Sequence, residues 1–314
     1  MYETFYGLSE LPFELTANPK YLFLTPGQRE ALSVLQYGLF SAKSITVLIG
    51  EAGTGKTTLL GAALGSERCR RVRCIYLNNP ALDKRDFIKE LALKFGLGTE
   101  CALSKALLLE QLERYLRQRR EAGEITALVV DEAQSLSVSL LEEIRLLANI
   151  ETPAVKLLPL VLAGQPELAA RLEDPVIRQL KQRVTLRCEL QPFDLENTAA
   201  YIANRISTAG GDASQIFTRE AVILIHERSS GIPRTINVIC DNALVAGMAI
   251  GRRRVDRALI SEICSDLRLS ALRNPPIGSD VNSAPDDASS PTTEWSDPMD
   301  PAMPLQSASR TITR

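Results

Sequence analysis

Residues 44–58 read "SITVLIGEAGTGKTT", and this stretch decides the fold. Its first seven residues are a short, mostly apolar run, which is typical of a strand buried on both faces of a parallel sheet. Glycines break the strand, and a helix follows them. Residues 50–57 fit the pattern G-x-x-x-x-G-K-[S/T] between a strand and a helix, where that pattern binds phosphate. The stretch therefore predicts a loop that holds the phosphates of a nucleotide.

The residue types of this loop suit that task. Glycines let the backbone wrap closely around phosphate, and the helix start adds a partial positive charge. Lys56 would neutralise phosphate oxygens, and the Thr57 hydroxyl would bind Mg²⁺. The residues expected to bind the nucleotide are Gly50, Gly53, Thr54, Gly55, Lys56, Thr57 and Thr58.

A second stretch, "ALVVDEAQ" at 127–134, ends a buried strand in two carboxylates. The carboxyl ends of parallel strands share one edge of the sheet, so these carboxylates are expected beside the phosphate loop. Asp131 would hold Mg²⁺ through water, and Glu132 would orient and polarise the attacking water. The two stretches together predict a Mg-dependent ATPase with ATP and Mg²⁺ as its cofactors.

Four further apolar runs have the character of buried strands, at 73–79, 126–131, 158–164 and 184–190. Helical patterns separate them, which predicts an α/β fold: a P-loop type, doubly wound and mostly parallel sheet. After Pro192 only helical patterns remain, at 194–207, 218–228, 234–249 and 256–269. An all-helical lid domain is therefore expected to follow the sheet, which leaves no room for the second sheet of a helicase.

These patterns divide the chain into four parts. We expect an N-terminal segment that packs on the core, a nucleotide-binding α/β domain, a helical lid domain and a disordered tail rich in Pro and Ser, at 1–25, 26–192, 193–269 and 270–314 respectively. The first part is expected to pack on the sheet domain through its aromatic side chains, Phe5, Tyr6, Phe13, Tyr21 and Phe23.

Composition excludes several classes of protein. The net charge of −2 lacks the general excess of base that marks many nucleic-acid binders. One histidine and six cysteines without a C-x₂-C pair give no zinc-site pattern. The opening "MYETFYGLSE" does not resemble a signal peptide, and no run of about 18 apolar residues occurs. We therefore expect a cytoplasmic protein without a transmembrane segment.

Further motifs point to a known family. "LAGQPEL" at 162–168, "RQLKQRV" at 178–184 and "GIPR" at 231–234, with the two stretches above, resemble an AAA+ ATPase. The opening "MYETFYGLSELPFELTANPKYLFLT" is similar to that of the ExeA-type ATPases of the general secretion pathway, a family that includes exosortase-associated and MSHA-pilus ATPases. The resemblance covers about residues 1–269. It also allows part of the opening segment to line the adenine pocket.

The resemblance implies roles for further polar residues. Gln165 falls at the sensor-1 position, where it would contact the γ-phosphate or the lytic water. Arg183, or alternatively Arg178, would be an arginine finger that reaches the nucleotide of a neighbouring protomer. Arg234, projected from a turn fixed by Gly231 and Pro233, would be the sensor-2 arginine that contacts the γ-phosphate from the lid. An arginine finger works only between protomers, so a homo-oligomeric ring or filament is expected.

The function expected from this resemblance is an ATP-driven motor or switch that serves a secretion, exopolysaccharide-export or pilus-assembly system. Its partner would be a protein of that membrane-associated system. ExeA-type proteins also carry a membrane span and a peptidoglycan-binding domain, which we do not expect here. The alternative is a DNA-associated transposition regulator of the TniB/TnsC kind, for which only the basic clusters at 68–73 and 251–257 offer support.

Overall fold

The computed structural model describes residues 1–16, 18–78 and 82–269, so the predicted disordered tail at 270–314 lies outside the described residues. Five parallel strands form one sheet in the order β2-β3-β4-β1-β5. They are β1 (Ile45–Gly50), β2 (Val72–Leu77), β3 (Ile125–Val130), β4 (Leu160–Gly164) and β5 (Val184–Leu190). All five are the strands that the apolar runs predict, with ends that differ by up to two residues. The predicted α/β class and parallel sheet are confirmed.

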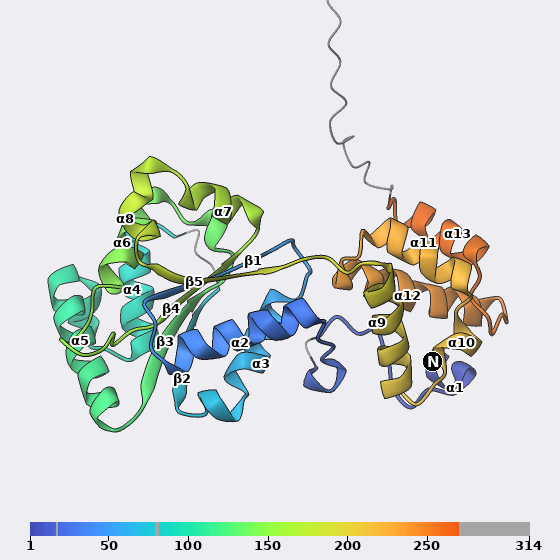
Figure 1. The fold of residues 1–314 in the computed structure, drawn as a ribbon, viewed down its shortest axis with the longest axis horizontal. Coiled ribbons are helices and arrows are strands. Elements are labelled where there is room, and N and C mark those ends of the chain that lie inside the picture. Colours follow the sequence, from blue (N-terminus) through green and yellow to red (C-terminus); the bar gives the residue numbers. More distant parts are fainter. Residues whose placement is uncertain (17, 79–81, 270–314) are drawn as a thin grey trace, which may run out of the picture. The chain divides into compact units, whose positions relative to one another are not determined.

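Helices cover both faces of this sheet (Figure 1). One face packs against α2 (Pro26–Phe40) and α3 (Lys56–Leu64), and the other packs against α4 (Lys84–Phe95), α5 (Lys105–Glu121), α6 (Val138–Leu147), α7 (Pro166–Leu172) and the short α8 (Arg178–Lys181). Successive side chains of a strand point to opposite faces. Val47 and Ile49 accordingly join the second core and Leu48 joins the first, so β1 is buried on both sides.

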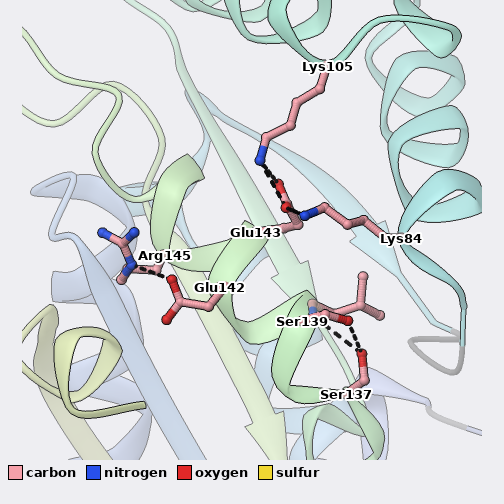
Figure 2. Close-up of polar contacts among 8 residues, drawn as sticks. Lys84, Lys105, Ser137, Ser139, Glu142, Glu143 and Arg145 are labelled. Atoms are coloured by element: carbon pink, nitrogen blue, oxygen red, sulfur yellow. Dashed lines mark hydrogen bonds and ion pairs between the residues drawn. The ribbon is translucent and has the colours of Figure 1, made fainter. Parts of the chain in front are cut away.

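An ion cluster around one buried carboxylate joins three of these helices on one face (Figure 2). The Glu143 carboxylate on α6 lies 2.6 Å from Lys84 Nζ of α4 and 2.7 Å from Lys105 Nζ of α5. Burial alone would raise the pKa of Glu143, but its hydrogen bonds to the two ammonium groups lower it below its usual value. Ser137 caps the start of α6 by accepting a hydrogen bond from the N–H of Leu140. Since α6 follows the acidic end of β3 closely, this cluster anchors the helix next to the candidate site.

A second group of helices follows β5: α9 (Leu195–Thr208), α10 (Ala213–Ile216), α11 (Arg219–Ser229), α12 (Pro233–Ala249) and α13 (Arg257–Asp266). Four of them correspond to the predicted helical patterns, and the single-turn α10 was not predicted. Their apolar faces share one core, in which Ile236, Ile239, Cys240 and Leu244 of α12 are completely shielded from solvent.

The N-terminal segment packs on these helices, which corrects the expectation that it packs on the sheet domain. Tyr2 of α1 (Tyr2–Tyr6), Leu8 and Phe13 belong to the same core as α9–α13. The Tyr2 hydroxyl donates to Asp241 Oδ1 at 2.5 Å, and Phe13 packs against Phe217 with ring centroids 6.3 Å apart. Helices already cover both faces of the sheet, whereas this segment completes the core of α9–α13.

The other aromatic side chains of the N-terminal segment also contact residues of the helical part of the chain, 193–269. Their partners are Arg253 for Phe5, Arg252 for Tyr6, Arg205 for Tyr21, and Phe193 and Tyr201 for Phe23. Within the residues that the structure describes, no helix has both the length and the apolar character needed to cross a bilayer.

Candidate nucleotide-binding site

The predicted phosphate loop lies between the end of β1 and the start of α3. Gly53 and Gly55 have φ values of +83° and +97°, a left-handed region that favours glycine. The Thr54 hydroxyl donates to the carbonyl of Glu51 at 2.9 Å and braces the turn. The loop is thus curled back over the start of α3, where the helix N–H groups can face an anion.

Lys56 lies inside this curl. Its Nζ donates to the carbonyl oxygens of Gly50 at 2.8 Å and Glu51 at 3.1 Å, and only 6% of the residue is exposed. Burial lowers the pKa of Lys56, and the nearby carboxylates of Glu132 and Asp131 oppose that shift. A charged ammonium group held by two carbonyls at a glycine-rich loop can exchange those partners for phosphate oxygens.

Thr57 and Asp131 bring two hard oxygen donors together. The Thr57 hydroxyl, in the first turn of α3, lies 3.1 Å from Asp131 Oδ2, directly after β3. Mg²⁺ prefers one or two such protein oxygens, with phosphate and water oxygens as its remaining ligands. Over the described ranges, no group of three or more His, Cys, Asp or Glu residues could hold a metal by itself. The donor set at this position therefore fits a nucleotide-bound Mg²⁺.

Glu132 is held by two amide side chains. Its Oε2 accepts hydrogen bonds from Gln134 Nε2 at 2.5 Å and Gln165 Nε2 at 3.3 Å. The bond from Gln134 is the main reason why the pKa of this carboxyl lies below its usual value; burial opposes the shift, while Gln165 and Lys56 support it. The residue has φ +54°, a strained value for a non-glycine residue. A carboxylate so held stays ionised and fixed in direction.

Gln165 N-caps α7 immediately after β4, so the structure brings this predicted residue to Glu132. Gln134 was not singled out in the sequence. The signal that could have found it is its place two residues after Glu132, on the one-turn 3₁₀ helix Ala133–Ser135, which points a polar side chain back toward the strand ends.

Arg234 reaches the loop from the helical part of the chain. Its backbone N–H donates to the carbonyl of Gly53 at 3.2 Å, in the first turn of α12. The preceding turn depends on Gly231, which has φ +71° and whose carbonyl accepts from the N–H of Phe193 at 2.8 Å. Pro233 occupies the first helical position, which suits its fixed φ.

A cavity of about 440 Å³ lies at the meeting point of these elements. Eight residues predicted for the site line it: Gly53, Thr54, Gly55, Lys56, Thr57, Thr58, Glu132 and Arg234. Asp131, Gln165 and Gly50 do not line it, but each is hydrogen-bonded to a residue that does. Arg183, which is half-buried, and Arg178, which is exposed, are not among the lining residues.

The wall opposite the phosphate loop comes from the N-terminal segment and α9. Leu22, Phe23 and Leu24 line it beside Tyr201, whose hydroxyl donates to Asn237 Oδ1 at 2.9 Å. Arg205, only 8% exposed, donates to the carbonyls of Pro12 and Glu14 and so fastens this segment. The family resemblance allowed part of this segment to line an adenine pocket without naming a side chain, and a role of this wall in binding adenine stays a prediction.

Comparison with known proteins agrees with this geometry. A family model described as AAA domain matches residues 40–172. General secretion pathway protein A of Aeromonas hydrophila is 41% identical over 261 residues, which cover 83% of this chain and 47% of that protein. The chain thus spans about half the length of this curated relative.

Two solved structures share the fold at low sequence identity. ORC2 of Aeropyrum pernix, in its ADPNP–ADP complexes, matches with a TM-score of 0.60 at 17% identity, over 82% of this chain and 72% of its own. Cdc6p of Pyrobaculum aerophilum gives a TM-score of 0.59 at 17% identity, over 84% of this chain and 72% of its own. Residues 40–172 therefore form an AAA domain, and most of the chain resembles General secretion pathway protein A.

Proposed function

We propose that this protein binds ATP with Mg²⁺ in the 440 Å³ cavity and hydrolyses it, as a motor or switch of a secretion, exopolysaccharide-export or pilus-assembly system. One observation carries the proposal. Thr57 Oγ1 and Asp131 Oδ2, from two elements 74 residues apart in sequence, lie 3.1 Å from each other beside the phosphate loop and Glu132. This convergence is what a nucleotide-bound cation requires.

Each residue of the site then has a defined task. Backbone N–H groups of the loop and the Lys56 ammonium bind the phosphates, while Thr57 and Asp131 hold Mg²⁺, which would neutralise charge on the β- and γ-phosphate oxygens. Glu132 polarises the attacking water, and Gln165 is close enough to Glu132 to reach the same water or the γ-phosphate. The lowered pKa of Glu132 keeps the carboxylate ionised for this role.

Arg234 couples the nucleotide to the helical lid. Its backbone contacts Gly53 and the residue lines the cavity, so its guanidinium is the group of the lid that would contact a γ-phosphate. Loss of the γ-phosphate would release this contact and let the lid move relative to the sheet, which converts hydrolysis into motion. The domain boundaries proposed from the sequence, 26–192 and 193–269, place the moving junction next to Phe193.

The biological setting is proposed from the relative, whose name assigns it to the general secretion pathway. We place this chain in the cytoplasm, where a protein of such a system would hold it at the inner face of the membrane. Assembly as a homo-oligomeric ring or filament would let Arg183, or alternatively Arg178, act on the nucleotide of a neighbouring protomer.

Steady-state ATP hydrolysis by the full chain tests the proposal. Turnover is expected with Mg²⁺ and is expected to vanish with excess chelator or in Lys56→Ala. Lys94→Ala, which changes an exposed lysine of α4, serves as the matched control and should keep the wild-type rate. Absence of turnover in the wild type under all these conditions would reject the proposal.

A second arm adds duplex DNA at about 0.1 M salt. Turnover that DNA leaves unchanged supports the secretion, export or pilus role. A severalfold rise that disappears with added salt would instead support the transposition-regulator alternative, because phosphate contacts weaken as salt increases.

A further inference from the structure

We infer that Gln134 is a positioning residue for the reaction, whose side-chain amide is clamped by Gln165 and Gly164 so that its NH₂ group holds the Glu132 carboxylate in place. This inference deepens the proposed ATP hydrolysis and rests on it. It concerns a residue that would touch neither nucleotide nor metal and would act only through Glu132.

The orientation of the Gln134 amide is fixed by its partners. The backbone N–H of Gln165 donates to Gln134 Oε1 at 3.1 Å. A backbone N–H can only donate, so it selects the oxygen of the amide and leaves the NH₂ group on the other side. That group faces Glu132 Oε2 at 2.5 Å. Gln134 thus presents a donor, and never an acceptor, to the carboxylate.

Gly164 provides the space for this arrangement. A Cβ placed on Gly164 would lie 2.8 Å from both Gln134 Oε1 and Leu168 Cδ2, closer than side-chain carbons normally approach. A side chain on the last residue of β4 would therefore force the Gln134 amide and Leu168 to shift. The glycine belongs to the same clamp as the two glutamines.

The backbone of Gln134 is held as well. The Arg171 guanidinium of α7 donates to the carbonyl of Gln134, and the preceding Ala133 is completely buried in the core. The side chain of Gln134 is thus hydrogen-bonded to the N-cap residue of α7, and its backbone is hydrogen-bonded to Arg171 of α7. Such double attachment makes it a rigid reference point for Glu132.

The clamp matters most when nucleotide binds. Among the residues that the structure describes, two amide groups donate to the Glu132 carboxylate, and the proposed function draws one of them, Gln165, toward the γ-phosphate or the water. Gln134 then remains the donor that keeps Glu132 directed at the water. Without it, a carboxylate on a strained backbone would be free to turn away.

The test compares two variants of Gln134 in the full chain. Gln134→Leu removes both amide contacts. Gln134→Glu keeps an oxygen acceptor for the Gln165 N–H but replaces the donor to Glu132 by a second carboxylate oxygen, so it exchanges the hydrogen bond for like-charge repulsion. For both, we expect kcat for ATP to fall about tenfold, which is less than the roughly 10²–10⁴-fold contribution of a general base because Glu132 itself is kept, while nucleotide affinity stays within about twofold of wild type. Gly164→Ala should lower kcat in the same way, and Gln118→Leu on the exposed face of α5 should not.

A double-mutant cycle with Glu132→Gln separates positioning from general loss of structure. Because Gln134 acts through Glu132, Gln134→Leu should have no further effect on the residual rate of Glu132→Gln. Thermal unfolding of each variant verifies that the protein remains folded. If Gln134→Leu does not fold, the isosteric Gln134→Glu provides the test of positioning.

Wild-type kcat in Gln134→Glu, or an effect of Gln134→Leu that persists undiminished beside Glu132→Gln, would overturn the inference and leave the proposed function intact. Absence of ATP turnover in the wild-type protein would overturn both this inference and the proposed function.

Discussion

The backbone N–H of Arg234 donates a hydrogen bond to the carbonyl oxygen of Gly53 at 3.2 Å, so the first turn of α12 rests directly on the phosphate loop. The contact is close enough that a Cβ on Gly53 would lie 2.8 Å from the Arg234 Cβ. The main chain therefore brings the arginine to the loop independently of its side chain, and contact of the guanidinium with a nucleotide stays a prediction.

This arrangement makes the arginine side chain testable by itself. Arg234→Ala keeps the backbone bond to Gly53, so the fold should be preserved while the guanidinium is lost. A hydrogen bond to a charged group contributes about 1.5–3 kcal/mol, so ATP turnover should fall about ten- to hundredfold. The measurement is kcat/KM for ATP, with Arg219→Ala on the exposed part of α11 as the control. An unchanged kcat/KM would show that the guanidinium does not reach the phosphate.

The turn before Arg234 should tolerate no side chain at Gly231. A Cβ there would lie 1.9 Å from the carbonyl oxygen of Phe193, and φ is +71°. Gly231→Ala is expected to destabilise the protein by about 2–5 kcal/mol, since the left-handed backbone costs about 1–2 kcal/mol and overpacking adds about 1–3 kcal/mol. Chemical denaturation measures the difference.

The control for that experiment is Gly61→Ala, in the interior of α3. Gly61 has no atom within 4 Å of an added Cβ and no positive φ. This variant should be stabilised by about 0.5–1 kcal/mol, because alanine favours a helix over glycine. Equal effects of the two substitutions would contradict the strain inferred at the Gly231 turn.

Local sequence patterns predicted the parts of the site that consist of residues close together in the sequence. The phosphate loop and the acidic strand end needed only short motifs, and the parallel sheet placed Thr57 and Asp131 together. Gln134 could not be found in this way. Its contact with Gln165 arises because β3 pairs with β4, with Val130 opposite Leu162. This pairing brings two turns that are 31 residues apart in sequence close together.

The N-terminal aromatic side chains illustrate a different limit. Their composition predicts that they are buried, but not on which surface. Tyr2 and Phe13 complete the core of α9–α13 because that group of helices leaves apolar surface to be covered, whereas the sheet is already covered on both faces. The surface on which the segment packs depends on the whole chain and cannot be predicted from the sequence of the segment alone.

Because Glu143 is ionised in its cluster with Lys84 and Lys105, the free energy of unfolding should depend on pH. The pKa of Glu143 is lowered in the folded state, so its contribution is fully present above the unfolded value of about 4.3 and is lost as pH falls through the lower folded value. Glu143→Gln should therefore destabilise the protein at pH 7, by about 1–3 kcal/mol, and by clearly less at pH 3.5.

Chemical denaturation at the two pH values measures this difference. Glu113→Gln is the matched control, because its carboxylate forms only an exposed pair with Arg117 on α5. That pair should contribute no more than about 0.5 kcal/mol at either pH. A Glu143→Gln effect of equal size at pH 7 and pH 3.5 would show that the cluster is not held by the ionised carboxylate.

Arg183 follows α8 and is not among the residues that line the cavity of its own chain, so the role proposed for it is at the nucleotide of a second protomer. Arg183→Ala should then lower turnover about a hundredfold or more, as loss of an arginine finger does. Mixing it in equal amounts with Lys56→Ala should restore about a quarter of the wild-type rate per protomer, because half of the protomers keep a competent loop and about half of those meet a competent arginine. Arg178→Ala, treated in the same way, distinguishes the two candidates. Mixtures that recover no activity, or a protein that remains monomeric with ATP, would exclude a finger at either position.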